Sequence, residues 1–285
     1  MSLKKKITFF LQQLIKPNSI DKERVDLYKI KKVNFDLQNL RRANEINLDQ
    51  IFNSHEINEF WKNTSVAIEK LGIPDGTGGV NPGDQRAIFY LISALKPKSV
   101  LEIGTHIGGS TVIIASAFSN FKIEKDSKLV SVDIRDVNSA KKKPWLKYGT
   151  KHSPKEMIDL LGYSSNVQFV KNTSLDYAKK SKQKFDFIFL DGDHTAKTVY
   201  EEIPIALRLL NPNGVILLHD FFTNCEPLWS NGSVIPGPFM AVERIIKEER
   251  NVQVKALGEL PWPTKLGSNV TSLALFLRQT DEFNF

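Results

Sequence analysis

Short apolar segments alternate with helical segments from Ser99 onward, and this alternation constrains the fold more than any other feature. The runs Phe185–Leu190 and Gly214–His219 are nearly continuous in apolar residues, which is typical of parallel strands buried on both faces. Helical periodicity fills the segment between them, Thr195–Leu210. Because parallel strands need long crossover connections, this order predicts a parallel sheet with helices on both faces.

The pattern predicts strands at 99–103, 128–133, 167–170, 185–190, 214–219, 252–257 and 271–277. The last two follow one another without a helix between them, which predicts an antiparallel pair at the sheet edge. We therefore expect an α/β fold with a Rossmann-like, seven-stranded and mostly parallel sheet that carries an antiparallel edge strand.

A glycine and proline-rich hinge at 72–83 divides the chain. Residues 1–77 are expected to form a helical N-terminal extension, a cap or a dimer arm, which begins with an amphipathic surface helix. Residues 78–285 are expected to form the main domain. At the hinge, Asn81 and Pro82 read as the N-cap and first residue of a helix.

Composition narrows the class of protein. Hydrophobic residues make up 41% and charged residues 25% of the 285 positions, which are ordinary globular values. The apolar runs fall short of the roughly 20 residues that span a membrane. A single cysteine, Cys225, excludes an internal disulfide and a cysteine-based zinc cluster, and without a secretory signal pattern it predicts a cytoplasmic protein.

The net charge of +7 could favour an anionic partner. Six lysines gather in one loop: Lys141, Lys142, Lys143, Lys147, Lys151 and Lys155. This loop could face an acidic substrate, or it could be an ordinary solvated surface. The sequence leaves both interpretations open.

A glycine turn follows the first predicted strand. Glu102 ends the strand, and Gly104, Gly108 and Gly109 let the chain turn closely around a ligand before a helix begins. This spacing differs from the G-x-G-x-x-G of dinucleotide folds. Glu102 would repel a diphosphate but could pair with an ammonium group, directly or through water, which favours a zwitterionic, cationic cofactor.

The second predicted strand ends at Asp133, where a carboxylate can accept hydrogen bonds from both ribose hydroxyls of a nucleoside. With Glu102 and the glycine turn, this pattern resembles the class I S-adenosylmethionine-dependent methyltransferases. The resemblance covers about residues 78–285 and identifies that segment as the methyltransferase domain. One departure is His106, where many members have glycine, because a side chain there crowds the turn.

The resemblance implies that the turn carries the methionine part of S-adenosylmethionine, Asp133 the ribose, and the end of the third strand the adenine. The segment 77–81 would lie over the methionine end, although a plain helix-entry turn explains it equally well. The implied cofactor residues are Val80, Glu102, Gly104, Thr105, Gly108, Ser110, Asp133, Asn172, Thr173, Ser174 and Asp191.

Polar residues also end two neighbouring central strands: Asp191, Asp193 and His194 after the fourth, and His219 and Asp220 at the end of the fifth. Open α/β sheets bind ligands at such ends. The residues resemble the metal-dependent O-methyltransferases, of the catechol and antibiotic-sugar types. That resemblance implies that Asp191 and Asp220 bind a divalent metal and that Asp193 is a candidate general base. We expect His219 to join the metal site, and His194 is a second candidate for the base. The alternative is that the aspartates cap the following helix.

Oxygen ligands favour Mg²⁺, whereas His219 would soften the site toward Mn²⁺, Fe²⁺ or Zn²⁺. In the register of the catechol enzymes, Phe221 stands where they have an asparagine ligand. Phe222, Trp229 and Trp262 could line a substrate pocket or pack locally.

We therefore expect a methyltransferase that acts on the hydroxyl of a small sugar, phenol or natural-product-like acceptor. RNA methylation and a non-catalytic cofactor-binding scaffold are the alternatives. No aromatic-rich basic motif supports a nucleic-acid partner. The sequence leaves open whether the protein forms a homo-oligomer.

Overall fold

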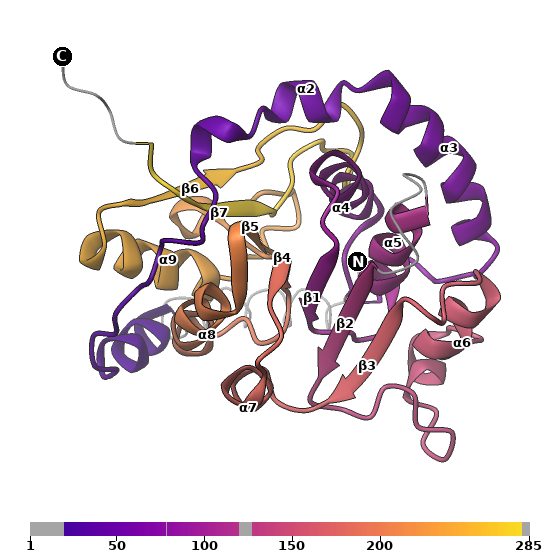
Figure 1. Ribbon diagram of the computed structural model, residues 1–285, viewed down its shortest axis with the longest axis horizontal. Coiled ribbons are helices and arrows are strands. Elements are labelled where there is room, and N and C mark those ends of the chain that lie inside the picture. The colour runs from indigo at the N-terminus through magenta and orange to yellow at the C-terminus, as the bar shows by residue number, and fades with distance from the viewer. Residues whose placement is uncertain (1–19, 78, 120–126, 281–285) are drawn as a thin grey trace, which may run out of the picture.

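The computed structural model describes residues 20–77, 79–119 and 127–280. Its seven strands form one sheet in the order β3-β2-β1-β4-β5-β7-β6 (Figure 1). The strands are β1 Ser99–Ile103, β2 Lys128–Asp133, β3 Val167–Lys171, β4 Phe185–Leu190, β5 Leu210–Leu218, β6 Val252–Ala256 and β7 Ala274–Arg278.

The first five strands pair in parallel, whereas β7 runs antiparallel to both β5 and β6. The predicted seven-stranded, mostly parallel sheet with an antiparallel pair at its edge is therefore confirmed. The reversed strand is β7, which lies between β5 and the edge strand β6. Burial explains this order. Residues 274–277 of β7 are all buried, whereas in β6 only Val252 is buried and the other four residues are exposed or half-buried.

Helices cover both faces of the sheet (Figure 1). One face packs against α4, α5 and α6, with α2 and α3 beyond them, and the other packs against α7, α8 and α9. The helices are α2 Leu48–Phe52, α3 His55–Glu69, α4 Pro82–Leu95, α5 Gly109–Ser119, α6 Pro154–Leu160, α7 Ser174–Lys180, α8 Ala196–Leu209 and α9 Gly237–Glu248, with short 3₁₀ turns η1 Ala43–Glu45, η2 Pro144–Tyr148 and η3 Thr223–Cys225.

The predicted start of α4 is confirmed. The side chain of Asn81 accepts a hydrogen bond from Asp84 N (3.0 Å), and Pro82 is the first helical residue. This cap fixes the position of Asp84 in the first turn of α4, where its side chain is fully buried.

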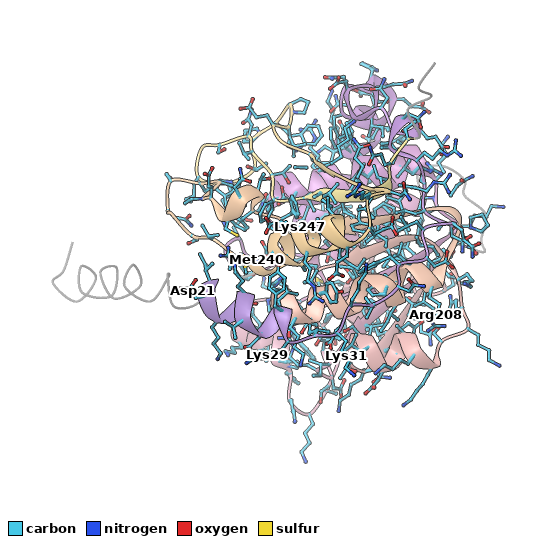
Figure 2. The ribbon with its side chains drawn as sticks, turned by 90° about the vertical axis from the view of Figure 1, so that its left-hand side faces the viewer. Asp21, Lys29, Lys31, Arg208, Met240 and Lys247 are labelled. Atoms are coloured by element: carbon cyan, nitrogen blue, oxygen red, sulfur yellow. The ribbon has the colours of Figure 1, made fainter. Side chains whose placement is uncertain are left out.

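The segment before α4 packs on the main domain at two places. Residues 20–28 are helical. The buried Arg244 of α9 donates to Leu27 O (2.5 Å) in this helix and to Ile30 O (2.9 Å) just after it, and its guanidinium lies 4.1 Å over the ring of Tyr200. Figure 2 shows this face, with Met240 and Lys247 of α9 labelled. Further on, Arg41 N donates to Gly214 O (2.9 Å). The predicted N-terminal surface helix lies outside the described residues.

No helix in the described part of the chain is long and apolar enough to span a membrane.

Candidate active site

The carboxyl ends of the parallel strands meet along one edge of the sheet. Backbone hydrogen bonds continue the pairing past the strand ends: Asp191 N donates to Ile103 O (2.9 Å), and His219 N donates to Leu190 O (3.1 Å). The predicted site residues brought to this edge include Gly104, Asp133, Asn172, Asp191 and His219.

The glycine turn passes directly against the end of β4. Gly104 has a φ of +101°, and a Cβ atom there would lie 2.0 Å from the carbonyl oxygen of Asp191. Gly108 N then donates to Thr105 O (2.7 Å), just before α5 begins. Ser110, in the first turn of α5, is buried. Gly104 is therefore required by the close approach of two strand ends.

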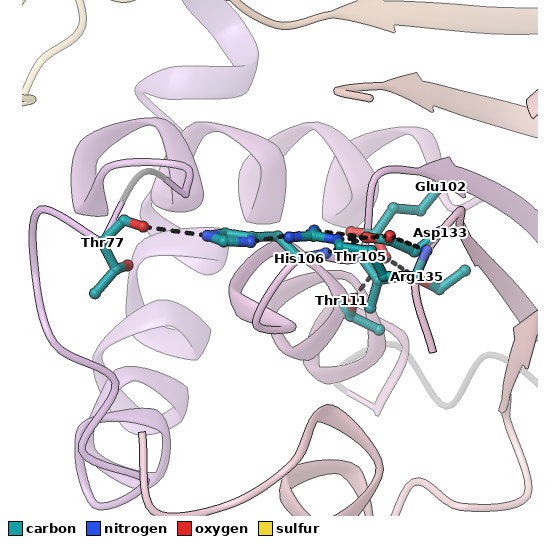
Figure 3. Close-up of polar contacts among 8 residues, drawn as sticks. Thr77, Glu102, Thr105, His106, Thr111, Asp133 and Arg135 are labelled. Atoms are coloured by element: carbon teal, nitrogen blue, oxygen red, sulfur yellow. Dashed lines mark hydrogen bonds and ion pairs between the residues drawn. The ribbon is translucent and has the colours of Figure 1, made fainter. Parts of the chain in front are cut away.

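His106 occupies the left-handed region with a φ of 49°. Its ring packs edge-on against Tyr148 (centroids 4.4 Å apart), and its Nε2 lies 3.1 Å from Thr77 O. The segment before α4 thus contacts the glycine turn through His106 (Figure 3). Val80 of the same segment is 7% exposed and lies in the core cluster on that face of the sheet.

Glu102 is fully buried beneath the turn. Its Oε2 accepts short hydrogen bonds from Thr111 Oγ1 and Ser131 Oγ (both 2.5 Å), and Ser131 Oγ also lies 2.6 Å from Thr105 Oγ1 (Figure 3). Burial raises the pKa of Glu102 to about 7, although the hydroxyls of Ser110, Ser131 and Thr111 oppose the shift. Glu102 is thus a buried carboxyl group beneath the turn, and its pKa is raised to about 7.

Replacing Glu102 with glutamine is expected to change how stability depends on pH. The folded pKa exceeds the unfolded value, so the folded protein binds more protons between about pH 4.5 and 7, and Glu102 lowers stability as pH rises through that window. The free energy of unfolding of the variant, taken relative to that of the unaltered protein, should therefore rise by on the order of 3 kcal/mol between pH 4 and pH 8. Urea unfolding of both proteins at pH 4 and at pH 8 measures this change. The same difference in unfolding free energy between the two proteins at both pH values would contradict the prediction.

Asp133 is 6% exposed, and both of its oxygens are hydrogen-bonded. Oδ1 accepts from Arg135 N (2.8 Å) and Nε (3.0 Å), and Oδ2 accepts from His106 N (2.9 Å) and Arg135 Nη2 (3.0 Å) (Figure 3). Burial raises the pKa of Asp133, but the bonds from Arg135 and His106 outweigh burial and lower it. Asp133 is therefore a fixed anion next to the glycine turn.

The end of β3 lies next to Asp133. Asn172 N donates to Asp133 O (3.0 Å). The side chain of Thr173 caps α7 by accepting from Asp176 N (3.1 Å), and Ser174 is the first residue of that helix. All three predicted adenine-side residues, 172–174, are half-buried.

Asp191, His219 and Asp220 converge, as the sequence predicted. Their ligand atoms all lie within 4.8 Å of one another, and we call these three residues the Asp-His-Asp cluster. His219 Nδ1 lies 2.9 Å from Asp191 Oδ1 and 3.5 Å from Asp220 Oδ1. Burial disfavours a charge on His219, but the two carboxylates outweigh burial and raise its pKa well above 6.5.

The Asp-His-Asp cluster fits a divalent cation. It offers two carboxylates and an imidazole, and neither nitrogen of His219 makes a well-formed hydrogen bond within the described residues. On the far side of the ring, Nε2 lies 3.4 Å from Asp84 Oδ2. Metal-binding histidines commonly direct their second nitrogen to a carboxylate in this way, which fixes the ring.

Asp193 and His194 take different positions. Asp193 is exposed, and its two oxygens hold the first turn of α8 by accepting from Thr195 N (2.9 Å) and Thr198 Oγ1 (3.0 Å). His194 faces the cluster, with Nδ1 3.5 Å from Asp220 Oδ2. Of the two candidate bases, the structure brings only His194 to the cluster. Asp193 instead caps the start of α8, which is the alternative that the sequence offered for these aspartates.

A family model described as a methyltransferase domain matches residues 101–221. This range begins in β1 and contains the glycine turn, Asp133 and the whole Asp-His-Asp cluster. The match identifies residues 101–221 as a methyltransferase domain. The family resemblance of the sequence is thereby confirmed.

Curated relatives of this chain are distant. It is 26% identical over 160 residues to a rhamnosyl O-methyltransferase of Mycobacterium leprae, which covers 55% of this chain and 62% of the relative. It is also 26% identical over 160 residues to a catechol O-methyltransferase of Niastella koreensis, which covers 54% of this chain and 63% of the relative. The match spans less than two thirds of either relative.

Solved structures share its fold. The O-methyltransferase TomG of Streptomyces achromogenes, in complex with SAM, matches with a TM-score of 0.52 at 17% identity, over 80% of this chain and 91% of that one. An O-methyltransferase of Bacillus cereus, in complex with SAH, matches with a TM-score of 0.50 at 18% identity, over 79% and 91%. These matches confirm the Rossmann-like architecture.

The sequence did not predict two residues of this candidate site, Asp84 and Arg135. Asp84 reads as an ordinary acidic residue in the first turn of a helix, so the sequence carried no signal for its approach to His219. Arg135 follows Asp133 by two residues, and that proximity was the available signal. Arg135 also lines a cavity of about 470 Å³ between α6 and β3, together with Lys155, which the sequence placed in a loop but which lies in the first turn of α6.

Proposed function

We propose that the chain binds S-adenosylmethionine at the carboxyl ends of β1 and β2 and transfers its methyl group to a hydroxyl of a small molecule. The observation that carries this proposal is the convergence of the Asp-His-Asp cluster beside the Gly104 turn. The rhamnosyl and catechol O-methyltransferases among the relatives support a hydroxylated acceptor, a sugar or a phenol.

The cofactor would lie across the first two strand ends. Asp133 would accept hydrogen bonds from the ribose hydroxyls, which requires Arg135 to give up part of its contact with that carboxylate. The turn at Gly104, Thr105 and Gly108, with Glu102 and Ser110 beneath it, would receive the methionine part. Residues 172–174 would lie beside the adenine, and Val80 would close the methionine end.

Methyl transfer requires the acceptor oxygen to lose a proton while it attacks the sulfonium methyl group. Asp191, His219 and Asp220 would hold a divalent cation, Mg²⁺ or Mn²⁺, which when bound lowers the pKa of a coordinated hydroxyl and orients its oxygen. We assign removal of the proton to His194, because the oxygens of Asp193 are engaged with α8. Asp84 would keep the ring of His219 in place.

Metal removal is expected to stop the reaction. The purified protein is incubated with methyl-labelled S-adenosylmethionine and either a catechol or a rhamnoside, with Mg²⁺, with Mn²⁺ or with EDTA. Label should reach the acceptor with either metal, and EDTA should reduce the rate at least about 1000-fold, since the metal contributes several kcal/mol. Transfer at the same rate in EDTA would contradict the metal assignment, and no transfer to any hydroxyl would contradict the proposed function.

Three predictions are kept as proposals: the division at residue 77, a homo-oligomer built through the N-terminal extension, and a cytoplasmic location. The last rests on the single free thiol of Cys225.

A further inference from the structure

The connection between β6 and β7 is a hairpin that reaches the end of β5, and we call residues 258–271 the 258–271 hairpin. Leu260 N donates to Asn269 O (3.0 Å) and Thr264 N to Ser268 O (2.8 Å). At its tip, Leu266 and Gly267 have φ values of 54° and 76°, as in a two-residue turn of type I′. The tip therefore has a defined backbone, which fixes the position of Lys265 at its start.

Contacts with α4 and β5 hold this hairpin beside the Asp-His-Asp cluster. Trp262 Nε1 donates to Gly83 O (2.9 Å), one residue before Asp84. A Cβ atom on Gly83 would lie 2.4 Å from Thr264 Cα, so the hairpin packs directly on the start of α4. Phe221 N, which follows Asp220, donates to Ser272 O (2.8 Å). The hairpin is thus attached to the start of α4, and the residue directly after the hairpin is attached to the segment that follows β5.

Lys265 extends from this hairpin over an aromatic pair. Its Nζ lies 4.1 Å from the ring of Trp229, and Trp229 packs edge-on against Phe222 (centroids 5.5 Å apart), two residues after Asp220. Trp229 is 5% exposed, and its Nε1 has no hydrogen-bond partner within the described residues. The ammonium of Lys265 is therefore held on a buried aromatic cluster that follows the end of β5.

The ammonium of Lys265 lies on the aromatic pair that follows Asp220 in the chain. Within the described part of the chain, no carboxylate lies within 4 Å of Lys265 Nζ, so its charge is not taken up by an ion pair. The ammonium is half-buried and held on an indole face, which leaves it available to an anion that enters beside Asp220.

We propose that Lys265 is a specificity-determining residue that binds the carboxylate of an acidic methyl acceptor. The acceptor class is a hydroxylated molecule that carries a carboxylate, with its hydroxyl toward the Asp-His-Asp cluster and its carboxylate toward the 258–271 hairpin. This inference rests on the proposed function and narrows its acceptor. A neutral acceptor of the same shape gains nothing from Lys265.

Two probes with the same hydroxyls test the inference: 3,4-dihydroxybenzoate, which is charged, and 3,4-dihydroxybenzyl alcohol, which is neutral. Binding of each probe to the full chain loaded with S-adenosylhomocysteine and Mg²⁺ is measured by calorimetry, and kcat/KM for methyl transfer is measured with S-adenosylmethionine. The variants are Lys265→Met, which keeps an unbranched apolar side chain on Trp229, and Lys265→Arg, which keeps the charge. Lys247→Met removes an exposed lysine of α9 and serves as the control for net charge (Figure 2).

The unaltered protein should prefer the benzoate at least about tenfold, in binding and in kcat/KM. Lys265→Met should remove this preference without weakening the alcohol, whereas Lys265→Arg and Lys247→Met should retain it. Equal use of both probes, an equal loss for both in Lys265→Met, or no binding of the benzoate to the cofactor-loaded protein would overturn the inference. Transfer to the alcohol would still support the proposed function, and failure to bind S-adenosylhomocysteine would count against that function instead.

Discussion

Replacement of Asp133 by alanine is expected to abolish measurable binding of S-adenosylhomocysteine. The buried carboxylate is the acceptor that the ribose hydroxyls would use, and its low pKa keeps it ionised. Hydrogen bonds to a charged group contribute about 1.5–3 kcal/mol each. Loss of two such bonds should raise Kd at least about 100-fold, which isothermal calorimetry measures.

A matched control separates the carboxylate from its ion pair. Arg135→Met removes the guanidinium but leaves Asp133 in place, so this variant should bind S-adenosylhomocysteine within about tenfold of the unaltered protein. Near-ultraviolet circular dichroism checks that both variants stay folded. If the arginine variant loses binding as completely as Asp133→Ala, the ribose assignment is wrong and the ion pair itself is what the cofactor site requires.

Replacement of Asp191 by alanine is expected to separate binding from turnover. Its carboxylate points to His219, whereas its backbone carbonyl contacts the glycine turn. The alanine variant keeps that backbone contact, so affinity for S-adenosylhomocysteine should change less than about threefold. Loss of a metal ligand should lower kcat for methyl transfer at least about 1000-fold, since metal assistance amounts to several kcal/mol.

The same experiment on Asp220→Ala tests whether the cluster acts as a unit, because both carboxylates face His219 Nδ1. Both variants should lose turnover and retain cofactor binding. Retained turnover in either variant would remove that residue from the metal site. Loss of cofactor binding in both, to the extent seen for Asp133→Ala, would mean that the assigned geometry of the site is wrong.

Much of the fold could be predicted from the sequence because the central strands are continuous apolar runs separated by helices. The order of the last two strands was also within reach. Residues 252–256 alternate apolar and polar residues, as an edge strand does, whereas 274–277 are all apolar, as an inner strand is. The absence of a helix between them predicts only that the two strands pair, and the difference between the two patterns is what indicates their order.

The candidate site was predictable where it lies at strand ends, since topology alone brings Asp133, Asp191 and Asp220 to one edge. The candidate site was not predictable where contacts between distant segments of the chain determine the position of a residue. Asp84 reaches His219 only because α4 packs above β5. Lys265 reaches the same region only because its hairpin folds over the start of α4. Neither position carries a sequence pattern that differs from an ordinary surface charge.

The most direct test of the account is calorimetric titration of S-adenosylhomocysteine into the purified full chain. The account predicts one saturable site with a Kd in the micromolar range, about −8 kcal/mol, which disappears in Asp133→Ala. Absence of binding by the folded, unaltered protein would contradict the cofactor assignment on which the metal, the acceptor and the role of Lys265 all depend.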